Sequence, residues 1–389
     1  MRGGRRVAVT GLGVVAPAGI GVEAFWAGLL GTPPAGAREV PDWDPSPWFG
    51  PKEARRTDRF SQFAVAAAEE ALADSGPPGT DLDRSGVFVA TGVGGLHTLE
   101  EQIVINHVKG SKRVSPFLVP MMMCNAAAAT VSMRFGWRGP CEATVTACAA
   151  STHAIGNAAR LIAMGICDAM LTGGSETAVT PTGMAGFHNM TAMSSSGISR
   201  PFDVERDGFV IAEGAAILVL EEWEHAVARG ATIRGEILGA ANTADAHHIT
   251  APSPDGAGAV RCMELALADA DLIAGQVGQI NAHGTSTPLN DVAESLAITK
   301  LFGSQSPPVV STKGVTGHAL GASGALEAAA VLLSMEHRLI PPTSGLVNLD
   351  PEVTIDVVSV SPRPWEPAPA LSNSFGFGGH NGCLVIGPA

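Results

Sequence analysis

Short apolar runs that end in glycine alternate along this chain with alanine-rich stretches of helical period. The apolar runs cover residues 6–14, 86–91, 168–172 and 279–282, and helical patterns lie between them. Buried strands that are joined by helices pack as a sheet with helices on both faces. The alternation therefore predicts an α/β fold with parallel strands.

The same order of elements restarts after a short acidic helix, so we expect two similar halves, residues 1–229 and 230–389. A proline-rich loop is expected over 33–51. Helices are expected over 22–30, 60–75, 119–135, 258–270, 290–302 and 321–336, and further strands over 208–220, 233–240, 309–311, 353–360 and 371–374.

Composition excludes several classes of protein. Of the 389 residues, 46% are hydrophobic and 16% are charged, which allows a large buried core. The net charge of −13 argues against nucleic acid as a general partner. No apolar run reaches the roughly 18 residues that a membrane span needs. The six cysteines are scattered without metal-type spacing and without a secretory leader, so we expect a cytoplasmic protein with no metal.

One cysteine lies in a sequence suited to a nucleophile. Ala143, Val145 and Ala147 form a short β-prone run before Cys148, and the small residues after it open a helical stretch that ends near Gly165. We therefore expect a sharp strand-to-helix turn, where unpaired helix N–H groups face the sulfur. Such groups favour the thiolate and can lower a cysteine pKa to about 3.5–7.5. The alternative is that Cys148 is only a small buried hydrophobic residue.

Three further stretches place polar or aromatic residues directly after predicted strands. His283 follows the strand at 279–282, Lys313 and His318 follow the strand at 309–311, and two phenylalanines lie in the glycine-rich segment 373–381. Ligands collect at the carboxyl ends of parallel strands. Taken singly, each is more often a structural histidine, a solvated lysine or a simple turn. Taken together, a cysteine, two histidines and a lysine indicate covalent thioester chemistry, with N–H groups holding an enolate or an oxyanion.

These motifs resemble those of the elongating β-ketoacyl-[acyl-carrier-protein] synthases of the thiolase superfamily, and the similarity runs from Val7 to Ile386. It rests on the cysteine turn, on Asn-Ala-His-Gly-Thr-Ser-Thr-Pro at 281–288, on Thr-Lys-x-x-x-Gly-His-x-x-Gly-Ala at 312–322 and on Asn-Ser-Phe-Gly-Phe-Gly-Gly at 373–379. Segments 199–203 and 206–210 also match. The resemblance implies a thiolase-like α/β fold, with two similar halves in αβαβα layers.

The resemblance also implies a reaction. Cys148 would take an acyl chain from a carrier protein, with its own N–H and that of Phe377 as the oxyanion hole. His283 and His318 would stabilise the enolate that forms when malonyl-carrier protein loses carbon dioxide, and the carbanion would attack the acyl thioester. Lys313 would orient His318 and tune the charge of the site.

Further residues take their expected roles from the same resemblance. Glu327 would be a buried partner of the histidine and lysine network, and Phe377 would also gate between acylation and condensation. No cofactor is implied. The acyl pocket would include Val93, Val119, Thr285, Thr287, Phe375 and Gly376.

Some features depart from the family pattern and leave alternatives open. The proline-rich loop and the segment 193–200 are shorter than is typical, and His380 stands where many relatives carry threonine. Acyl chain length, and fatty-acid against polyketide or polyene elongation, stay open. So does the choice between a homodimer and a heterodimer with a chain-length-factor homologue. The rival functions are a non-catalytic chain-length-setting subunit, which lacks the cysteine, and a degradative thiolase, which uses coenzyme A and a second cysteine.

An acidic carrier protein needs a local basic surface on a chain that is itself acidic. Two clusters qualify, and the resemblance adds Arg200. The alternative is that these are ordinary solvated charges. The expected docking residues are Lys52, Arg55, Arg56 and Arg59 in one cluster, Lys109, Lys112 and Arg113 in the other, and Arg200.

Overall fold

The computed structural model describes residues 1, 3–33, 35–303 and 305–389. Pro34, in the predicted proline-rich loop, lies outside the described residues. Ten strands follow the order β4-β3-β5-β6-β1-β7-β13-β12-β8-β9, and β2 (Gly19–Ile20) pairs with β1. The first five are β4 (Cys141–Glu142), β3 (Ser85–Ala90), β5 (Ala169–Glu176), β6 (Gly214–Glu222) and β1 (Val7–Ala16). The others are β7 (Gly235–Ala244), β13 (His380–Gly387), β12 (Ala370–Gly376), β8 (Gln279–Asn281) and β9 (Val309–Val310).

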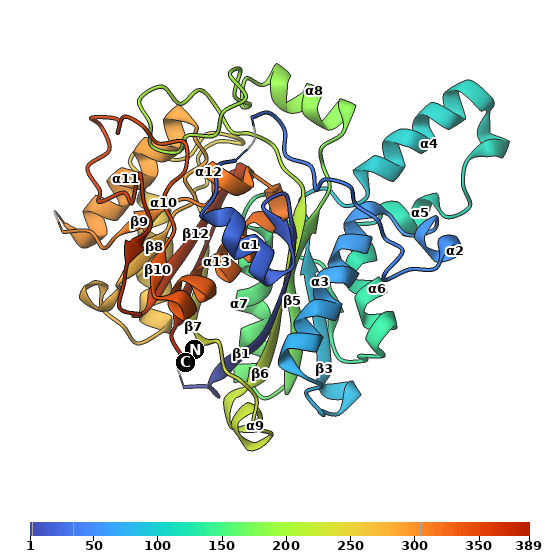
Figure 1. Cartoon of the computed structure of the whole chain (residues 1–389), viewed down its shortest axis with the longest axis horizontal. Helices are drawn as coiled ribbons and strands as arrows, with labels where there is room; N and C mark the ends of the chain where they lie inside the picture. The colour runs from blue at the N-terminus through green and yellow to red at the C-terminus, as the bar shows by residue number, and fades with distance from the viewer. Residues whose placement is uncertain (2, 34, 304) are drawn as a thin grey trace.

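The sheet consists of two groups of five strands that touch at one end. Strands β1 and β7 pair only at Ala8 with Glu236 and at Val9 with Gly235. Helices α7 (Ala150–Ala163) and α13 (Ser323–His337) lie between the two groups (Figure 1). Helices α3 (Arg59–Ser75) and α6 (Ala126–Phe135) cover the outer face of the first group, and α10 (Ala257–Asp269) and α11 (Pro288–Phe302) cover that of the second. The result is five layers in the order αβαβα.

Small residues allow the two middle helices to approach each other. A Cβ on Gly324 of α13 would lie 2.1 Å from Thr152 Oγ1 on α7. Residues 323–335 of α13 are all buried. A larger side chain at Gly324 would therefore push the two middle helices apart.

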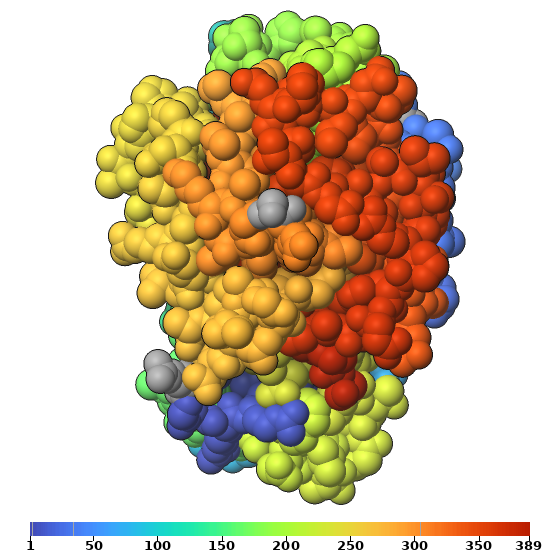
Figure 2. Space-filling view, turned by 90° about the vertical axis from the view of Figure 1, so that its left-hand side faces the viewer, coloured from blue at the N-terminus to red at the C-terminus, as the bar shows by residue number. Residues whose placement is uncertain are grey.

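The remaining elements connect these layers or extend from them. Figure 1 shows α4 extending away from the layered body, and Figure 2 shows that residues of the second half cover most of the opposite end. Among the described residues, no helix is both long and apolar enough to cross a bilayer. The other elements are α1 (Val22–Leu29), α2 (Pro51–Ala54), α4 (Leu96–Lys109), α5 (Leu118–Met122), α8 (Pro181–Asn189), α9 (Trp223–Ala228), α12 (Lys313–Thr316), β10 (Leu339–Ile340), β11 (Arg363–Pro364) and five 3₁₀ turns: 82–84, 111–113, 274–276, 320–322 and 377–379.

The prediction of parallel sheets is wrong in part, because both strand groups are mixed. Strands β3, β4 and β5 are parallel, as are β12, β8 and β9, but β6 and β13 run antiparallel to their neighbours. The turn at 377–379 sends the chain directly back from β12 into β13 as a hairpin. A hairpin gives an antiparallel pair, whereas a parallel pair needs a crossover.

Three predicted elements differ in extent. Residues 353–360 form no strand and make one isolated bridge, from Val357 to Val309, because β9 is only two residues long and offers no longer ladder. Residues 208–213 lie before β6 and form isolated β-bridges, such as the one between Ile211 and His318. The helix predicted over 119–135 is two helices, α5 and α6, which are separated at 123–125.

Candidate active site

A cavity of about 440 Å³ is lined by Cys148, His283, His318 and Phe377. His283 lies two residues after β8, His318 lies two residues after α12, and Phe377 follows β12 directly. Cys148 lies two residues before α7. Four segments that are far apart in the sequence therefore place their predicted reactive groups in one cavity.

Cys148 is held at a strained turn and not at the end of a strand. Strand β4 ends at Glu142, so the predicted strand over 143–147 is absent. Ala147 has a φ of 49°, in the left-handed region that costs an L-residue roughly 1–2 kcal/mol. The backbone of this turn packs against Gly376, where a Cβ would lie 3.0 Å from Cys148 N. Contact with the end of β12 at Gly376 thus holds the turn in place of a strand that leads into it.

The predicted lowering of the cysteine pKa is wrong. Cys148 is 6% exposed, and burial raises the pKa of its thiol to about 11. Lys313 and the backbone N–H groups of Phe377 and Cys148 act in the opposite direction, but they do not offset the loss of solvation. The resting cysteine is therefore a thiol, and its proton has to be transferred when the sulfur reacts.

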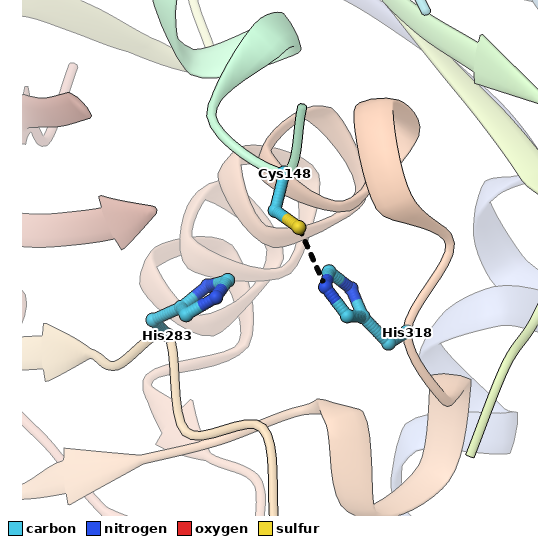
Figure 3. A group of neighbouring side chains, drawn as sticks. All are labelled: Cys148, His283 and His318. Carbon is cyan, nitrogen blue, oxygen red and sulfur yellow. Dashed lines mark hydrogen bonds between the residues drawn. The ribbon is translucent and has the colours of Figure 1, made fainter. Parts of the chain in front are cut away.

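His318 is the nearest group that can take this proton. Its Nε2 lies 3.0 Å from Cys148 Sγ (Figure 3). Its Nδ1 lies 2.9 Å from Ser323 Oγ. Burial, followed by Lys313, holds the pKa of His318 well below its usual value, so the imidazole is neutral. Because the thiol is the donor, Nε2 is the acceptor and Nδ1–H donates to Ser323.

His283 faces the same sulfur from the other side (Figure 3). Its backbone N–H donates to Glu294 Oε1 at 2.9 Å, and Lys313 Nζ lies 3.4 Å from its Nδ1. Burial and then the charge of Lys313 hold the pKa of His283 well below its usual value. An ammonium group can only donate, so Nδ1 is the acceptor and the hydrogen of this neutral imidazole is on Nε2.

Lys313 bonds to His283, and no hydrogen bond joins it to His318 among the described residues, contrary to the prediction that it orients His318. Its Nζ donates to the backbone oxygen of His283 at 2.7 Å and forms a short ion pair with Glu327. Both members of this pair are buried. Burial raises the pKa of Glu327 to about 7, although Lys313 acts to lower it. Within the predicted network, Glu327 thus pairs with Lys313.

Most of the predicted pocket residues line the cavity. They are Val93, Thr285, Thr287, Phe375 and Gly376. Val119 does not line it, because this residue lies on α5 with 56% of its surface exposed. The cavity thus extends from the cysteine toward the loops that follow β3, β8 and β12.

Most of the predicted docking residues form two adjacent exposed groups, and Arg59 and Arg200 belong to neither group. Lys52, Arg55 and Arg56 lie on or just after α2, and Lys112 and Arg113 lie in the 3₁₀ turn after α4; all five are exposed, as is Lys109. The guanidinium of Arg56 lies 4.4 Å from the ring centre of Phe117, which joins the two groups. Arg59 instead forms an ion pair with Glu213, and Arg200 pairs with Glu205 at 2.9 Å.

Two buried glutamates hold the loops of the site and were not predicted. Glu176, at the end of β5, accepts hydrogen bonds from the N–H groups of Gly92 at 2.5 Å and Gly321 at 3.1 Å. Glu294, on α11, accepts from the N–H groups of His283 and Gly284. Burial raises the pKa of each carboxyl to about 7. An acidic residue on an otherwise buried helix face or strand is a sequence feature that indicates such a role.

The sequence also did not identify Ser323, the partner of His318 Nδ1, or Arg38 as residues of the site. Arg38 is 2% exposed, and its guanidinium donates to the backbone oxygens of residues 313–315 at the end of α12. Burial lowers the pKa of Arg38 to about 10. No local pattern links Arg38 to α12, since they lie far apart in the sequence.

Comparison with known proteins agrees with this geometry. Profiles described as "Beta-ketoacyl synthase, N-terminal domain" and "Beta-ketoacyl synthase, C-terminal domain" match residues 47–226 and 234–347. A 3-oxoacyl-[acyl-carrier-protein] synthase 2 of Synechocystis sp. is 46% identical over 98% of this chain and 98% of its own.

Two solved structures share the whole fold. The ishigamide ketosynthase/chain length factor superposes with a TM-score of 0.93 at 34% identity, over 99% of this chain and 100% of that one. A beta-ketoacyl synthase from Burkholderia phymatum superposes with a TM-score of 0.92 at 35% identity over the same shares. The predicted layered α/β fold is confirmed, and the chain belongs to the β-ketoacyl synthase family of acyl-transferring condensing enzymes.

Proposed function

We propose that this enzyme extends carrier-bound acyl chains by decarboxylative Claisen condensation with a malonyl thioester. The observation that carries the proposal is the arrangement of Cys148 Sγ between the imidazoles of His283 and His318 in one cavity, with Sγ 3.0 Å from His318 Nε2. The presence of Cys148 argues against a chain-length-setting subunit without a nucleophile. Cys383, which follows the glycine loop in the sequence, is buried inside β13 and does not line the cavity, which argues against a second catalytic thiol.

Acyl transfer begins with the thiol of Cys148. His318 Nε2 takes the thiol proton while the sulfur attacks the acyl thioester, and the N–H groups of Cys148 and Phe377 hold the oxyanion. The same proton then leaves with the carrier thiol. A preorganised acceptor is needed because burial keeps the pKa of the thiol near 11.

Condensation uses the two histidines as donors. The malonyl thioester loses carbon dioxide, and the enolate oxygen accepts from Nε2–H of His283 and of His318. Lys313 fixes the His283 tautomer for this role. The hydroxyl of Ser323 can turn and donate to His318 Nδ1, which allows His318 to carry its hydrogen on Nε2 in this step. The enolate carbon attacks the acyl carbonyl, the bond from that carbon to Cys148 Sγ breaks, and the released thiolate takes up a proton from solvent.

Mass spectrometry tests the nucleophile. The intact enzyme should gain one acyl group from acyl-carrier protein, on the peptide of Cys148, and Cys148→Ala should gain none. Cys141→Ala is the matched control, because Cys141 is exposed and should be dispensable. An adduct on another cysteine with Cys148 free would refute the assignment.

The basic surface formed by Lys52, Arg55, Arg56, Lys112 and Arg113 is our proposed docking site for the acidic carrier protein. Double replacement of Arg55 and Arg56 by Glu should raise the KM for acyl-carrier protein and leave reaction with a small acyl thioester unchanged. Arg261→Glu, on the exposed side of α10, is the matched charge control. Equal use of the carrier by both variants at low ionic strength would exclude this surface.

A second chain is proposed to pack against α4. The helix exposes Ile103, Val104 and Val108 by 59%, 56% and 69%, on the segment that projects from the body in Figure 1. Exposed apolar patches of this kind mark protein interfaces. The purified chain alone should sediment as a dimer, and Val104→Asp with Val108→Asp should give monomers. An inactive wild-type monomer that gains activity with a second homologue would instead indicate a heterodimer; a similar ketosynthase from Xenorhabdus doucetiae was solved in complex with its chain length factor.

The chain is also proposed to divide near Gly230 into the predicted halves.

The 46% identity to a 3-oxoacyl synthase 2 favours fatty-acid elongation over polyketide assembly. Product analysis with purified carrier proteins from each type of pathway tests this preference.

A further inference from the structure

We infer that Cys148, His283 and His318 also form a binding site for a thiophilic divalent cation, with Zn²⁺ as the type case, which blocks acyl transfer. One sulfur and two imidazole nitrogens converge on one point of the cavity, and the three ligand atoms lie within 4.8 Å of one another. The proposed condensation uses no metal, so this site is additional to it. Metal binding can be measured without turnover, whereas its inhibitory effect rests on the proposed function.

The geometry suits a tetrahedral ion. Zinc binds cysteine sulfur at about 2.3 Å and histidine nitrogen at about 2.0–2.1 Å, so the ligand atoms stand roughly 3.5 Å apart. Cys148 Sγ and His318 Nε2 are 3.0 Å apart, and the widest separation is within 4.8 Å. Small rotations of the three side chains bring the set around one ion. Three protein ligands leave the fourth position open to the cavity.

The two imidazoles offer their Nε2 atoms in different ways. His318 accepts from the Cys148 thiol through Nε2, so this nitrogen carries no hydrogen, and its Nδ1 lies 2.9 Å from Ser323 Oγ, an outer partner that orients the ring. His283 carries its hydrogen on Nε2, so binding of the ion moves this hydrogen to Nδ1. Lys313 then gives up its 3.4 Å contact with Nδ1 and keeps its bonds to the backbone oxygen of His283 and to Glu327. Nε2 of each ring then faces the ion.

The surrounding charges favour an added cation. Three buried carboxyls, Glu176, Glu294 and Glu327, contact the loops of the site, and the buried cations found there among the described residues are Lys313 and Arg38. An ion of charge +2 stabilises the ionised carboxylates and the thiolate.

Binding is a simple exchange: the Cys148 S–H bond breaks, an S–Zn bond forms, and one proton goes to solvent. A sulfur and nitrogen ligand set selects Zn²⁺ or Co²⁺ over Mg²⁺ or Ca²⁺, which prefer oxygen ligands. The bound ion covers the sulfur, so it excludes the acyl thioester. An acylated Cys148 excludes the ion in turn.

Titration of the purified enzyme with Co²⁺ tests the site by absorption spectroscopy. We expect one ion per chain, a near-ultraviolet thiolate-to-cobalt band and visible bands of tetrahedral cobalt. Cys148→Ala, or wild type blocked with iodoacetamide, should lose the thiolate band, and His283→Ala and His318→Ala should weaken binding. Ser323→Ala should weaken it about tenfold through the outer partner. Cys141→Ala and His188→Ala, both exposed, should bind as the wild type does.

Zn²⁺ should displace Co²⁺, release one proton per chain, protect Cys148 from iodoacetamide and inhibit acyl transfer until a chelator is added. The blocked wild type keeps the test valid if a substitution prevents folding. Cobalt bands that persist in the Cys148→Ala variant, or Zn²⁺ that leaves Cys148 alkylation unchanged, would overturn the inference. Metal binding in a protein that proved unable to condense thioesters would refute the proposed function and leave the metal site standing.

Discussion

The two sides of the cavity are held by different kinds of interaction. On the side of Cys148, backbone contacts hold the nucleophile. Ala147 takes a left-handed conformation, the turn packs on Gly376, and Gly324 lets α13 lie directly against α7. Steric fit therefore fixes the sulfur, and little on this side depends on charge.

On the opposite side, polar side chains hold the histidines. Lys313 joins His283 to Glu327, and Glu294 accepts the backbone N–H of His283. All these groups are buried. Changes near the cysteine should therefore act through packing at any pH, whereas changes near the histidines should depend on the pH.

The largest expected effect is on the polar side. Lys313→Met leaves Glu327 buried without its counter-charge, which should lower the free energy of unfolding by about 3–5 kcal/mol at pH 8. Burial already raises the pKa of Glu327 to about 7, above its value in the unfolded chain. Between these two pKa values the folded state binds the extra proton, so stability falls as the pH rises. The loss should therefore be smaller at pH 5.

Urea denaturation at both pH values measures this effect. The double variant with Lys313→Met and Glu327→Gln should recover most of the loss, because a neutral amide needs no counter-charge. A single variant as stable as wild type at pH 8 would show that the pair does not hold this side of the cavity.

The two histidines should differ in the half-reactions that they serve. His283→Ala should slow malonyl decarboxylation by about 10²–10³-fold, the usual cost of losing one oxyanion donor, and leave acylation of Cys148 largely intact. His318→Ala should slow both, because its Nε2 contacts Cys148 Sγ. Separate assays of carbon dioxide release and of acyl-enzyme formation measure the two steps. Equal losses in the His283→Ala variant would remove the distinction.

On the cysteine side, Gly324→Ala should destabilise the fold by about 1–3 kcal/mol, because its Cβ would meet Thr152 Oγ1 at 2.1 Å. This loss should be the same at pH 5 and pH 8. Gly275→Ala is the matched control, since a Cβ there meets nothing within 4 Å. Thermal unfolding measures both variants, and a loss that varied strongly with pH would contradict the division between the two sides.

The smallest effect should come from Ser323→Ala. Loss of a neutral hydrogen bond to His318 costs about 0.5–1.5 kcal/mol, so decarboxylation should slow by roughly two- to tenfold. Ser334→Ala is a control on the same helix, because its hydroxyl is buried and donates to the backbone oxygen of Ala330 at 2.8 Å. Ser323→Thr should restore the rate. A Ser323→Ala rate equal to that of wild type would mean that His318 needs no partner at Nδ1.

The sequence motifs were sufficient to place Cys148, His283, His318 and Phe377 around one cavity. Strand and helix periods located most elements, because apolar spacing reflects burial directly. The antiparallel strand β13 was missed, because its turn at 377–379 resembles any glycine-rich loop. The direction of a strand depends on its connection and not on its composition.

The electrostatics of the site were harder to predict. The position of Cys148 before a helix indicates a lowered pKa, but the extent of burial that reverses the shift depends on segments far along the chain. The contact of Lys313 with His283 similarly depends on how β8 and β9 pair. Local sequence therefore identifies the reactive groups, and three-dimensional packing sets their protonation.

The buried side chain of Arg38 has a consequence for folding. Its hydrogen bonds to the end of α12 join residues 275 to 277 positions apart. Contacts of such long sequence separation form slowly, because the ends of a long segment must meet first. On the ribosome, Arg38 is made early and lacks these acceptors until residues 313–315 have also been made. During refolding, helical content should return before thiol reactivity at Cys148 reaches its native value.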